Sequence, residues 1–369
     1  MTGRSIAVVG AGIIGCLIAR ELTARDPDAT VTVLDRDLIG SGVTRRSAGV
    51  SLVKGGTPRT RQMSAFSHAY YAALRATLPG LPIYPVDARL VLPGQGDPAD
   101  SGYLPEHIGV ATAPAESLAA ELQLPAKSRV WQLGGCHYAD VPALTQVIAA
   151  LSRPRVRFAE AVKVTALTVG TAEVTLTCGS GEQLRADQVV LAPGPWLAEP
   201  AWADLLAPLG LRVKKIVAMH LERPPGPDDE LVIFDEEDAF LLPVIHRGHW
   251  LFSYTRLEWD VDPNAPAQGL SPADVEAARE CLRPYSPALA DACVSGRVCC
   301  DAYSRDHAPV VSALDDTDGR VIFAGAANGS GYRLGPAIAN QAVNLLYDTD
   351  IDTDASTASQ GATDDHQHV

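Results

Sequence analysis

The fold of this chain is decided by residues 6–35, which read IAVVGAGIIGCLIARELTARDPDATVTVLD. Four apolar residues come first, and such a short run is typical of a buried parallel strand. Gly10, Gly12 and Gly15 follow in the spacing G-x-G-x-x-G, and a run with apolar side chains at helical spacing comes after them. A second β-branched run ends in Asp35, twenty residues after Gly15. This order of strand, glycine turn, helix and strand predicts a βαβ unit.

Each part of this unit has a physical function in dinucleotide binding. Gly10 allows a tight turn, Gly12 lets the backbone approach a pyrophosphate, and Gly15 lets the helix pack closely on the sheet. The helix N-terminus offers free N–H groups to the phosphates. Asp35 can accept hydrogen bonds from a ribose hydroxyl, and its charge would repel the 2′-phosphate of NADP. A glycine-rich turn of another α/β protein is the alternative, but it leaves the position of the acid unexplained. The residues expected at this site are Gly10, Gly12, Ile13, Ile14, Gly15 and Asp35.

The composition limits the class of protein. The chain has 369 residues, of which 47% are hydrophobic, enough for two domains or one large one. Its net charge of −14 argues against nucleic acid as a partner. The seven cysteines show no C-x-x-C pairing, which favours a reduced, cytoplasmic setting. We expect no signal peptide, and no apolar run is long enough to span a membrane. A monomer or homodimer is expected.

The loop after Asp35 makes the interpretation more specific. Residues 40–49 read GSGVTRRSAG, and small residues of this kind let the backbone approach a flat ligand. A flexible surface loop is the alternative. An acid after the second strand, followed by this segment, resembles the FAD-dependent family of D-amino-acid oxidase, glycine oxidase and monomeric sarcosine oxidase. The resemblance implies FAD rather than NAD, with the loop running along the pyrophosphate and flavin. The contacts it implies are Arg36, Ser41, Thr44, Arg46, Ser47, Ala48 and Gly49.

Two later segments also resemble this family. Residues 188–196 (QVVLAPGPW) are similar to its second signature, an apolar strand that ends in an A-x-G-x-W turn. Residues 321–337 (VIFAGAANGSGYRLGPA) are similar to its last unit, in which a helix points its N-terminus at the flavin pyrimidine end. The resemblance covers residues 4–347. The further cofactor contacts it implies are Val162, Ala192, Gly194, Trp196, Gly329, Gly331, Tyr332, Arg333 and Leu334.

We therefore predict an α/β fold with a Rossmann-like FAD-binding domain of the glutathione-reductase type. Its segments would be residues 1–82, 137–205 and 297–348. A second, α+β substrate domain on an antiparallel sheet would comprise 83–136 and 206–296, and 349–369 would be a disordered acidic tail. Helices are expected at 62–78, 115–123, 141–151, 272–282 and 337–347. Strands are expected at 83–92, 211–221, 231–234, 239–245 and 250–255. A β-meander is expected at 156–158, 162–167, 173–177 and 183–186.

The resemblance implies that a hydride passes from the carbon beside an amine to flavin N5. The imine is then hydrolysed, and oxygen or another electron acceptor reoxidises the flavin. Cys299 stands seven residues before Asp306, which matches a C-x-Y-T-x-x-x-D segment whose cysteine is bound covalently to FAD in the sarcosine oxidase branch. An ordinary pair of buried cysteines, Cys299 and Cys300, is the alternative.

Two positions depart from the family. Asp301 stands where D-amino-acid and glycine oxidases have a carboxylate-binding arginine; an acid there repels a carboxylate and attracts an ammonium. Leu251 stands where the sarcosine branch has an oxygen-activating lysine, so another electron acceptor is an alternative to oxygen. Arg333 is the best candidate to bind a substrate carboxylate, ahead of Arg59 and Arg61.

The remaining candidates are weaker. Tyr254 and Trp250 could line the substrate pocket, although strand aromatics are more often core. His307, beside Asp306, could act as a base or be structural. No metal-ligand pattern is present. The catalytic candidates are Arg333, Tyr254, Asp301 and His307.

The leading hypothesis is an FAD-dependent amine or amino-acid oxidoreductase, as an oxidase rather than a dehydrogenase, and as an enzyme of a specialised biosynthetic pathway. The substrate would be a small amine. A flavin-dependent 2-hydroxy-acid dehydrogenase and a non-catalytic flavin-binding protein are the alternatives, because fold alone does not separate them.

Overall fold

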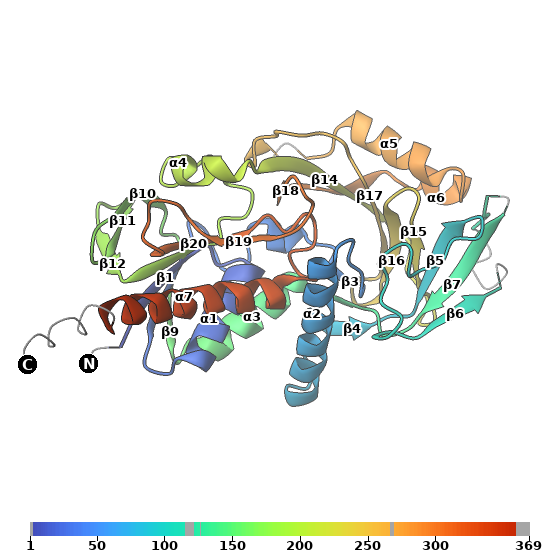
Figure 1. The fold of residues 1–369 in the computed structure, drawn as a ribbon. Helices are drawn as coiled ribbons and strands as arrows, with labels where there is room; N and C mark the ends of the chain where they lie inside the picture. Colours follow the sequence, from blue (N-terminus) through green and yellow to red (C-terminus); the bar gives the residue numbers. More distant parts are fainter. Residues whose placement is uncertain (1–2, 115–121, 126, 266–268, 359–369) are drawn as a thin grey trace, which may run out of the picture.

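Two large β-sheets, one toward each end of the molecule, organise the chain (Figure 1). The computed structural model describes residues 3–114, 122–125, 127–265 and 269–358. Both sheets are assembled from segments that lie far apart in the sequence, so the chain passes between them several times.

The first sheet has six strands in the order β19-β20-β13-β1-β2-β9. Five of them run parallel, and β19 is antiparallel to β20. The first strand alternates between two cores: Ile6 and Val8 pack on one face, Ala7 and Val9 on the other. Burial on both faces explains why this strand is apolar at every position. The strands are β1 (Ser5–Val9), β2 (Thr30–Leu34), β9 (Val156–Ala159), β13 (Gln188–Leu191), β19 (Val310–Ala313) and β20 (Val321–Gly325).

Helices cover one face of this sheet and a small antiparallel meander covers the other (Figure 1). The helices are α1 (Ile13–Arg25), α3 (Val141–Ser152) and α7 (Gly335–Ala358). The meander consists of β10 (Val164–Val169), β11 (Val174–Cys178) and β12 (Gln183–Ala186). This three-layer arrangement confirms the predicted Rossmann-like architecture.

The second sheet has eight strands in the order β18-β14-β17-β16-β15-β5-β7-β6. All neighbours are antiparallel except β15 and β5, so the predicted antiparallel sheet contains one parallel pair. Helices α5 (Pro272–Leu282) and α6 (Pro287–Asp291) lie on one face (Figure 1). The strands are β5 (Ala88–Pro93), β6 (Val110–Ala113), β7 (Ser128–Leu133), β14 (Arg212–Leu221), β15 (Leu231–Phe234), β16 (Ala239–Val244), β17 (His249–Tyr254) and β18 (Ser295–Tyr303).

Smaller elements connect the two parts. A three-stranded sheet has the order β3-β8-β4, and the long helix α2 stands beside it (Figure 1). Their bounds are β3 (Val50–Ser51), α2 (Pro58–Thr77), β4 (Ile83–Pro85) and β8 (His137–Ala139); the short helix α4 spans Ala203–Leu206, and 3-10 turns lie at Val43–Arg46, Ala207–Leu209 and Ile245–Arg247.

Local capping explains where the helices begin. The Asp140 side chain accepts a hydrogen bond from the Ala143 N–H at 3.2 Å, and Pro142 occupies the first turn of α3. Ser271 caps α5 in the same way. Helix α2 begins at Pro58, four residues before the predicted start at residue 62, because Thr57 caps it.

Several predicted boundaries were wrong. The strand predicted at 83–92 is divided between β4 and β5, which belong to different sheets. Residues 156–158 join the parallel sheet and not the meander. The last helix continues to Ala358, so the tail predicted as disordered from 349 begins inside it, and 359–369 lie outside the described residues. Most of the helix predicted at 115–123 also lies outside them.

The division into two domains stays a prediction. Strand β18 (Ser295–Tyr303) pairs along its whole length with β14, so the predicted boundary at residue 297 falls inside a strand of the second sheet.

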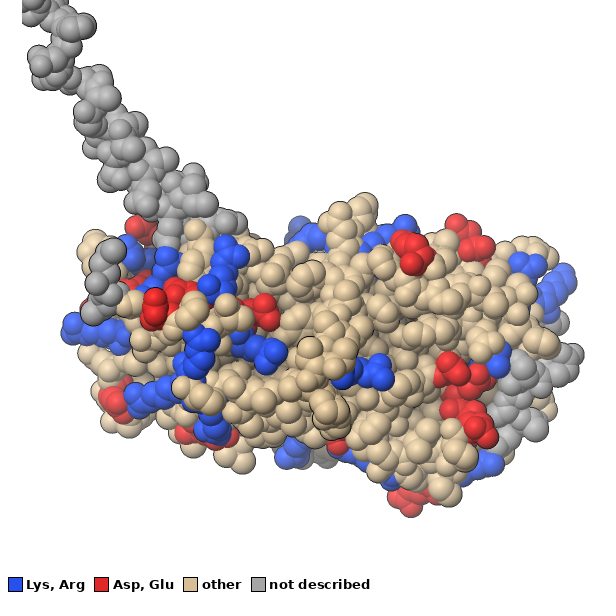
Figure 2. All heavy atoms as spheres, turned by 90° about the horizontal axis from the view of Figure 1, so that it is seen from below, with Lys and Arg blue, Asp and Glu red and all other residues tan. Residues whose placement is uncertain are grey.

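On the face seen in Figure 2, acidic and basic side chains are mixed at both ends of the molecule and the middle carries few charges. No helix among the described residues is long and apolar enough to cross a membrane.

We predict that Gly15→Ala destabilises the protein strongly. A Cβ at this position would overlap the carbonyl oxygen of Gly10, so α1 would have to move away from β1. Such overpacking costs about 3 kcal/mol. Urea unfolding of the variant measures this loss. Gly56→Ala is the matched control, because a Cβ there has nothing within 4 Å. Equal stability of the two variants would contradict the prediction.

Candidate active site

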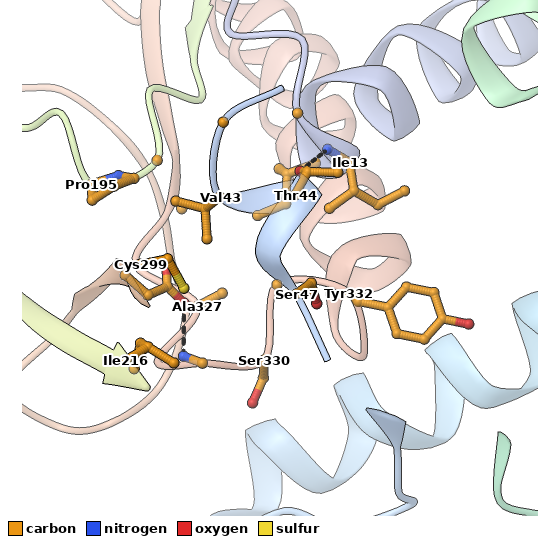
Figure 3. A pocket seen from close by; sticks show the side chains of 18 of the residues that line it. Ile13, Val43, Thr44, Ser47, Pro195, Ile216, Cys299, Ala327, Ser330 and Tyr332 are labelled. Carbon is orange, nitrogen blue, oxygen red and sulfur yellow. Dashed lines mark hydrogen bonds between the residues drawn. The ribbon is translucent and has the colours of Figure 1, made fainter. Parts of the chain in front are cut away.

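A cavity of about 460 Å³ lies where the two sheets approach each other. Its walls come from the turn after β1, the segment after β2, the turns after β13 and β20, and one face of β14 and β18. In Figure 3, Val43 and Ser47 from the loop and Ile216 and Cys299 from the second sheet lie around the same space. Ligands of open parallel sheets bind at these carboxyl ends of the strands.

The glycine turn forms one end of the cavity. Gly10 has a φ of +107°, and a Cβ there would overlap the carbonyl oxygen of Ala192 at the end of β13. Gly12, the first residue before α1, has no capping side chain of its own. Instead the Ile13 N–H donates to the Thr44 hydroxyl at 3.0 Å (Figure 3). The start of α1 therefore faces the cavity with its positive end, as anion binding requires.

Asp35 is held rigidly at the end of β2. One carboxylate oxygen accepts from the Ala11 N–H at 2.6 Å and the other from the Asp37 N–H at 2.8 Å. Burial raises the pKa of Asp35, and these two backbone hydrogen bonds act against that rise. Each carboxylate oxygen can accept more than one hydrogen bond, so Asp35 can still bind a ribose hydroxyl.

A flat platform lies beside Asp35. The Arg36 guanidinium stacks 4.0 Å from the centre of the Trp196 ring and pairs with Glu199 at 3.2 Å. Lys163 pairs with the other oxygen of Glu199 at 2.9 Å, and Val162 completes the wall. Sequence reasoning missed Glu199 and Lys163, whose role depends on contacts between distant segments.

Most of the predicted cofactor residues line this one cavity. They are Gly10, Gly12, Ile13, Ile14, Gly15, Asp35, Arg36, Thr44, Arg46, Ser47, Ala48, Val162, Ala192, Gly194, Trp196, Cys299, Gly329, Gly331, Tyr332 and Arg333. The Tyr332 ring itself turns away from the cavity (Figure 3) and stacks on Tyr71, so Tyr332 offers mainly its backbone.

Three predicted cofactor residues, Ser41, Gly49 and Leu334, are not among the residues that line the cavity. The Ser41 hydroxyl donates to the Leu38 carbonyl at 2.7 Å. Gly49 has a φ of +71° and lies against the Ala139 backbone. Leu334 packs in the core beneath α1 and α7. We infer that these residues support the loop and the last turn from behind.

Strand β18 presents alternate side chains to the cavity. Cys299, Asp301 and Tyr303 line it, whereas Cys300 does not. Burial, followed by the charge of Asp301, raises the pKa of the Cys299 thiol to about 12. Of the two adjacent cysteines, only Cys299 therefore has its side chain on the cavity wall. Covalent attachment of FAD to Cys299 stays a prediction.

Asp301 is a fixed carboxylate on the cavity wall. Its two oxygens accept hydrogen bonds from the N–H groups of Gly329 and Ala302, each at 2.8 Å. Burial raises the pKa of Asp301 to about 6, although both hydrogen bonds act to lower it. A carboxylate with this pKa can exist in either protonation state near neutrality.

Arg333 is a cation on the same cavity. Its guanidinium donates to the Lys54 carbonyl at 2.6 Å and to the Ser330 hydroxyl at 2.7 Å. Within the described part of the chain it forms no ion pair, and burial lowers its pKa. Lys54 itself is paired with Asp235 at 2.7 Å. Arg333 therefore has donors left for an anionic ligand.

The two remaining catalytic candidates differ in position. Tyr254 is among the residues that line the cavity, but its ring packs against α5 and its hydroxyl donates to the Asp274 carbonyl at 2.6 Å, so the hydroxyl is already engaged. His307 is exposed in the turn after β18 and does not line the cavity, which does not suit a base. Trp250 is also core.

Three further residues considered in the sequence analysis, Arg59, Arg61 and Leu251, do not line the cavity. Arg59 donates to the Pro309 carbonyl, and Arg61 to the Gly55 carbonyl. Leu251 is buried in the second sheet's core. Among the described residues no cluster of His, Cys, Asp or Glu could hold a metal ion.

Sequence reasoning also missed lining residues. Lys214 and Tyr303 lie on β14 and β18, Asp238 on the turn after β15, and Tyr103 on a loop. For Lys214 the sequence did contain an indication, because a lysine within a largely apolar strand is unusual enough to suggest a functional position.

The comparisons agree with this geometry. The profile of a family described as FAD dependent oxidoreductase matches residues 5–345. No curated protein sequence matches the chain. A glycine oxidase from Geobacillus kaustophilus is similar in structure, with a TM-score of 0.75, 18% identity, and coverage of 93% of this chain and 95% of that one.

Two other solved structures are similar to nearly the same extent. NikD, an unusual amino acid oxidase essential for nikkomycin biosynthesis, has a TM-score of 0.73 at 17% identity over 100% of both chains. An L-proline dehydrogenase from P. horikoshii has a TM-score of 0.73 at 17% identity over 94% of each chain. At these identities the likeness establishes the fold alone.

We predict that Asp35→Asn weakens FAD binding about tenfold, because a hydrogen bond to a charged acceptor is worth about 1.5–3 kcal/mol. Fluorescence titration of the FAD-free protein, with Cys299→Ser in every variant so that binding stays reversible, measures the dissociation constant. Asp28→Asn is the control, since Asp28 is exposed and does not line the cavity. An unchanged constant for Asp35→Asn would contradict the assignment of this carboxylate to the ribose.

Proposed function

Because this chain belongs to the family of FAD-dependent oxidoreductases, we propose that it oxidises the carbon–nitrogen bond of a small amine or amino acid. The observation that carries the proposal is the Asp301 carboxylate, which is fixed on the cavity wall where an ammonium group can reach it. An anionic oxygen there suits an amine and repels a substrate with only acidic groups.

The residues of the cavity suit FAD. The uncapped glycine turn and the start of α1 would hold the pyrophosphate, Asp35 the ribose, and the Arg36–Trp196 platform the adenine side. The loop at 43–48 and the turn at 329–333 would enclose the rest. When bound, the flavin supplies the hydride acceptor.

The protein's own groups would bind and orient the substrate. Asp301 would attract the ammonium group in its ionised form and could hold a proton on its carboxyl group, because its pKa of about 6 allows both states. Arg333 would bind an acidic group with its remaining N–H donors. The apolar side chains of Ile216 and Val43 would exclude water from the reacting carbon.

We propose oxygen as the electron acceptor, so that the protein acts as an oxidase and releases hydrogen peroxide. The absence of a lysine at Leu251 leaves another acceptor as the alternative outcome. A specialised biosynthetic substrate remains our expectation.

The proposal predicts a specific pattern of flavin reduction. Purified holoenzyme mixed without oxygen with a panel of amines, amino acids and 2-hydroxy acids should be bleached only by nitrogen compounds. Admission of air should then restore the colour with release of peroxide. Bleaching by hydroxy acids alone would indicate a 2-hydroxy-acid dehydrogenase, and no bleaching by any compound would favour a non-catalytic flavoprotein.

Ammonium binding should depend on pH through Asp301. Ethylammonium remains charged in this range, whereas Asp301 ionises as the pH rises past about 6. Affinity should therefore increase about tenfold between about pH 5 and pH 7. Calorimetric titration of the holoenzyme measures it. Asp301→Asn should abolish the dependence, and Asp315→Asn, an exposed acid, should retain it.

Covalent attachment can be tested through the adjacent cysteines. We predict that acid precipitation leaves FAD in the pellet for the native protein and for Cys300→Ser, and in the supernatant for Cys299→Ser, because only Cys299 lines the cavity. Release of all FAD from the native protein would remove the covalent assignment.

A further inference from the structure

Strands β14 and β18 place two opposite charges directly across from each other. Lys214 and Asp301 are partners in the antiparallel register, and both line the cavity. The neighbouring pair, Ile216 and Cys299, lines it as well, so this face of the two strands forms one wall.

The two charges do not form an ion pair. Opposite charges at directly paired positions normally attract each other. Asp301, however, is held by the N–H groups of Gly329 and Ala302. The Lys214 ammonium lies instead near two aromatic rings, 5.2 Å from the centre of Tyr303 and 5.4 Å from that of Trp259.

Lys214 is thus a buried cation without an anionic partner among the residues that the structure describes. Only 6% of it is exposed. Burial lowers its pKa, and only the charge of Asp238 acts in the opposite direction. Aromatic faces stabilise an ammonium less than an anion does. Buried charges in proteins are normally paired, so the arrangement leaves a place for an anion.

The adjacent lysine shows that the same strand can satisfy a buried ammonium. Lys215 points to the opposite face, where it pairs with Asp274 at 2.9 Å and Glu258 at 3.2 Å. Among the described residues, carboxylates therefore pair with the lysine on the side of α5, and none pairs with Lys214 on the side of the cavity.

We propose that Lys214 binds a carboxylate of the substrate while Asp301 binds its ammonium group, which makes the substrate class amino acids rather than simple amines. This inference rests on the proposed function. It assigns a specificity role to a residue on β14 and adds a second cation to Arg333, which reaches the cavity from the turn after β20.

The proposal is tested with acetate as the anionic probe and ethylammonium as the cationic one. Calorimetric titration of the FAD-loaded protein measures binding without turnover. Lys214→Met should weaken acetate binding tenfold or more and leave ethylammonium binding unchanged. Lys214→Arg, which keeps the charge, should restore most of the acetate affinity.

Arg212→Met is the matched control. Arg212 lies on the same strand, and its guanidinium is 4.9 Å from the centre of the same Trp259 ring, but it is exposed and paired with Asp260. This variant should bind acetate as the native protein does.

The proposal is overturned if Lys214→Met binds acetate as tightly as the native protein, or if the native protein does not bind acetate. It is also overturned if Lys214→Met changes only the rate of flavin reoxidation, since Lys214 would then serve the flavin and not the substrate. A failure of the proposed function shows separately, as an absence of flavin reduction by every nitrogen compound.

Discussion

The close approach of three backbone segments at the glycine turn is the constraint on which the structure depends. Gly10 lies against the end of β13, and Gly15 lies against Gly10 itself. Any side chain at either position would separate β1 from α1 or from β13. These contacts bring three features to one edge of the sheet: the start of α1, Asp35 and the end of β13. Backbone N–H groups and a fixed carboxylate can bind a dinucleotide there.

The second sheet completes the site by approaching that edge with two strands. β14 and β18 pair over nine positions and turn one face toward the first sheet. The cavity is therefore built from a cofactor side, formed by the first sheet, and a proposed substrate side, formed by β14 and β18. The charges on the substrate side are arranged by strand register. Asp301 is fixed by backbone N–H groups, and Lys214 opposite it has no ion-pair partner among the described residues. Register thus controls both the polarity of the pocket and the choice of Cys299 over Cys300.

The sequence predicted the cofactor side well because its signals are local. The glycine spacing and the apolar run of β1 each depend on residues a few positions apart. The substrate side was predicted less well. Tyr254 lines the cavity as expected, but its hydroxyl donates to the Asp274 carbonyl beneath α5 and not to the pocket. His307 follows Asp306 in the sequence, yet the turn leaves it exposed. Neither outcome can be derived from spacing, because both depend on how these segments pack in the tertiary structure.

The sequence by itself determined the βαβ unit and the class of fold, because a turn that requires glycine and a buried parallel strand each restrict the residues allowed at neighbouring positions. Its resemblance to a known family implied the cofactor. Only the tertiary structure decided which charges meet in the pocket. Lys214 and Asp301 are 87 residues apart, from 214 to 301, and are brought together by the pairing of β14 with β18. The physical reason is that hydrogen-bond register between distant strands depends on the packing of the whole sheet, whereas a glycine turn depends on its own backbone.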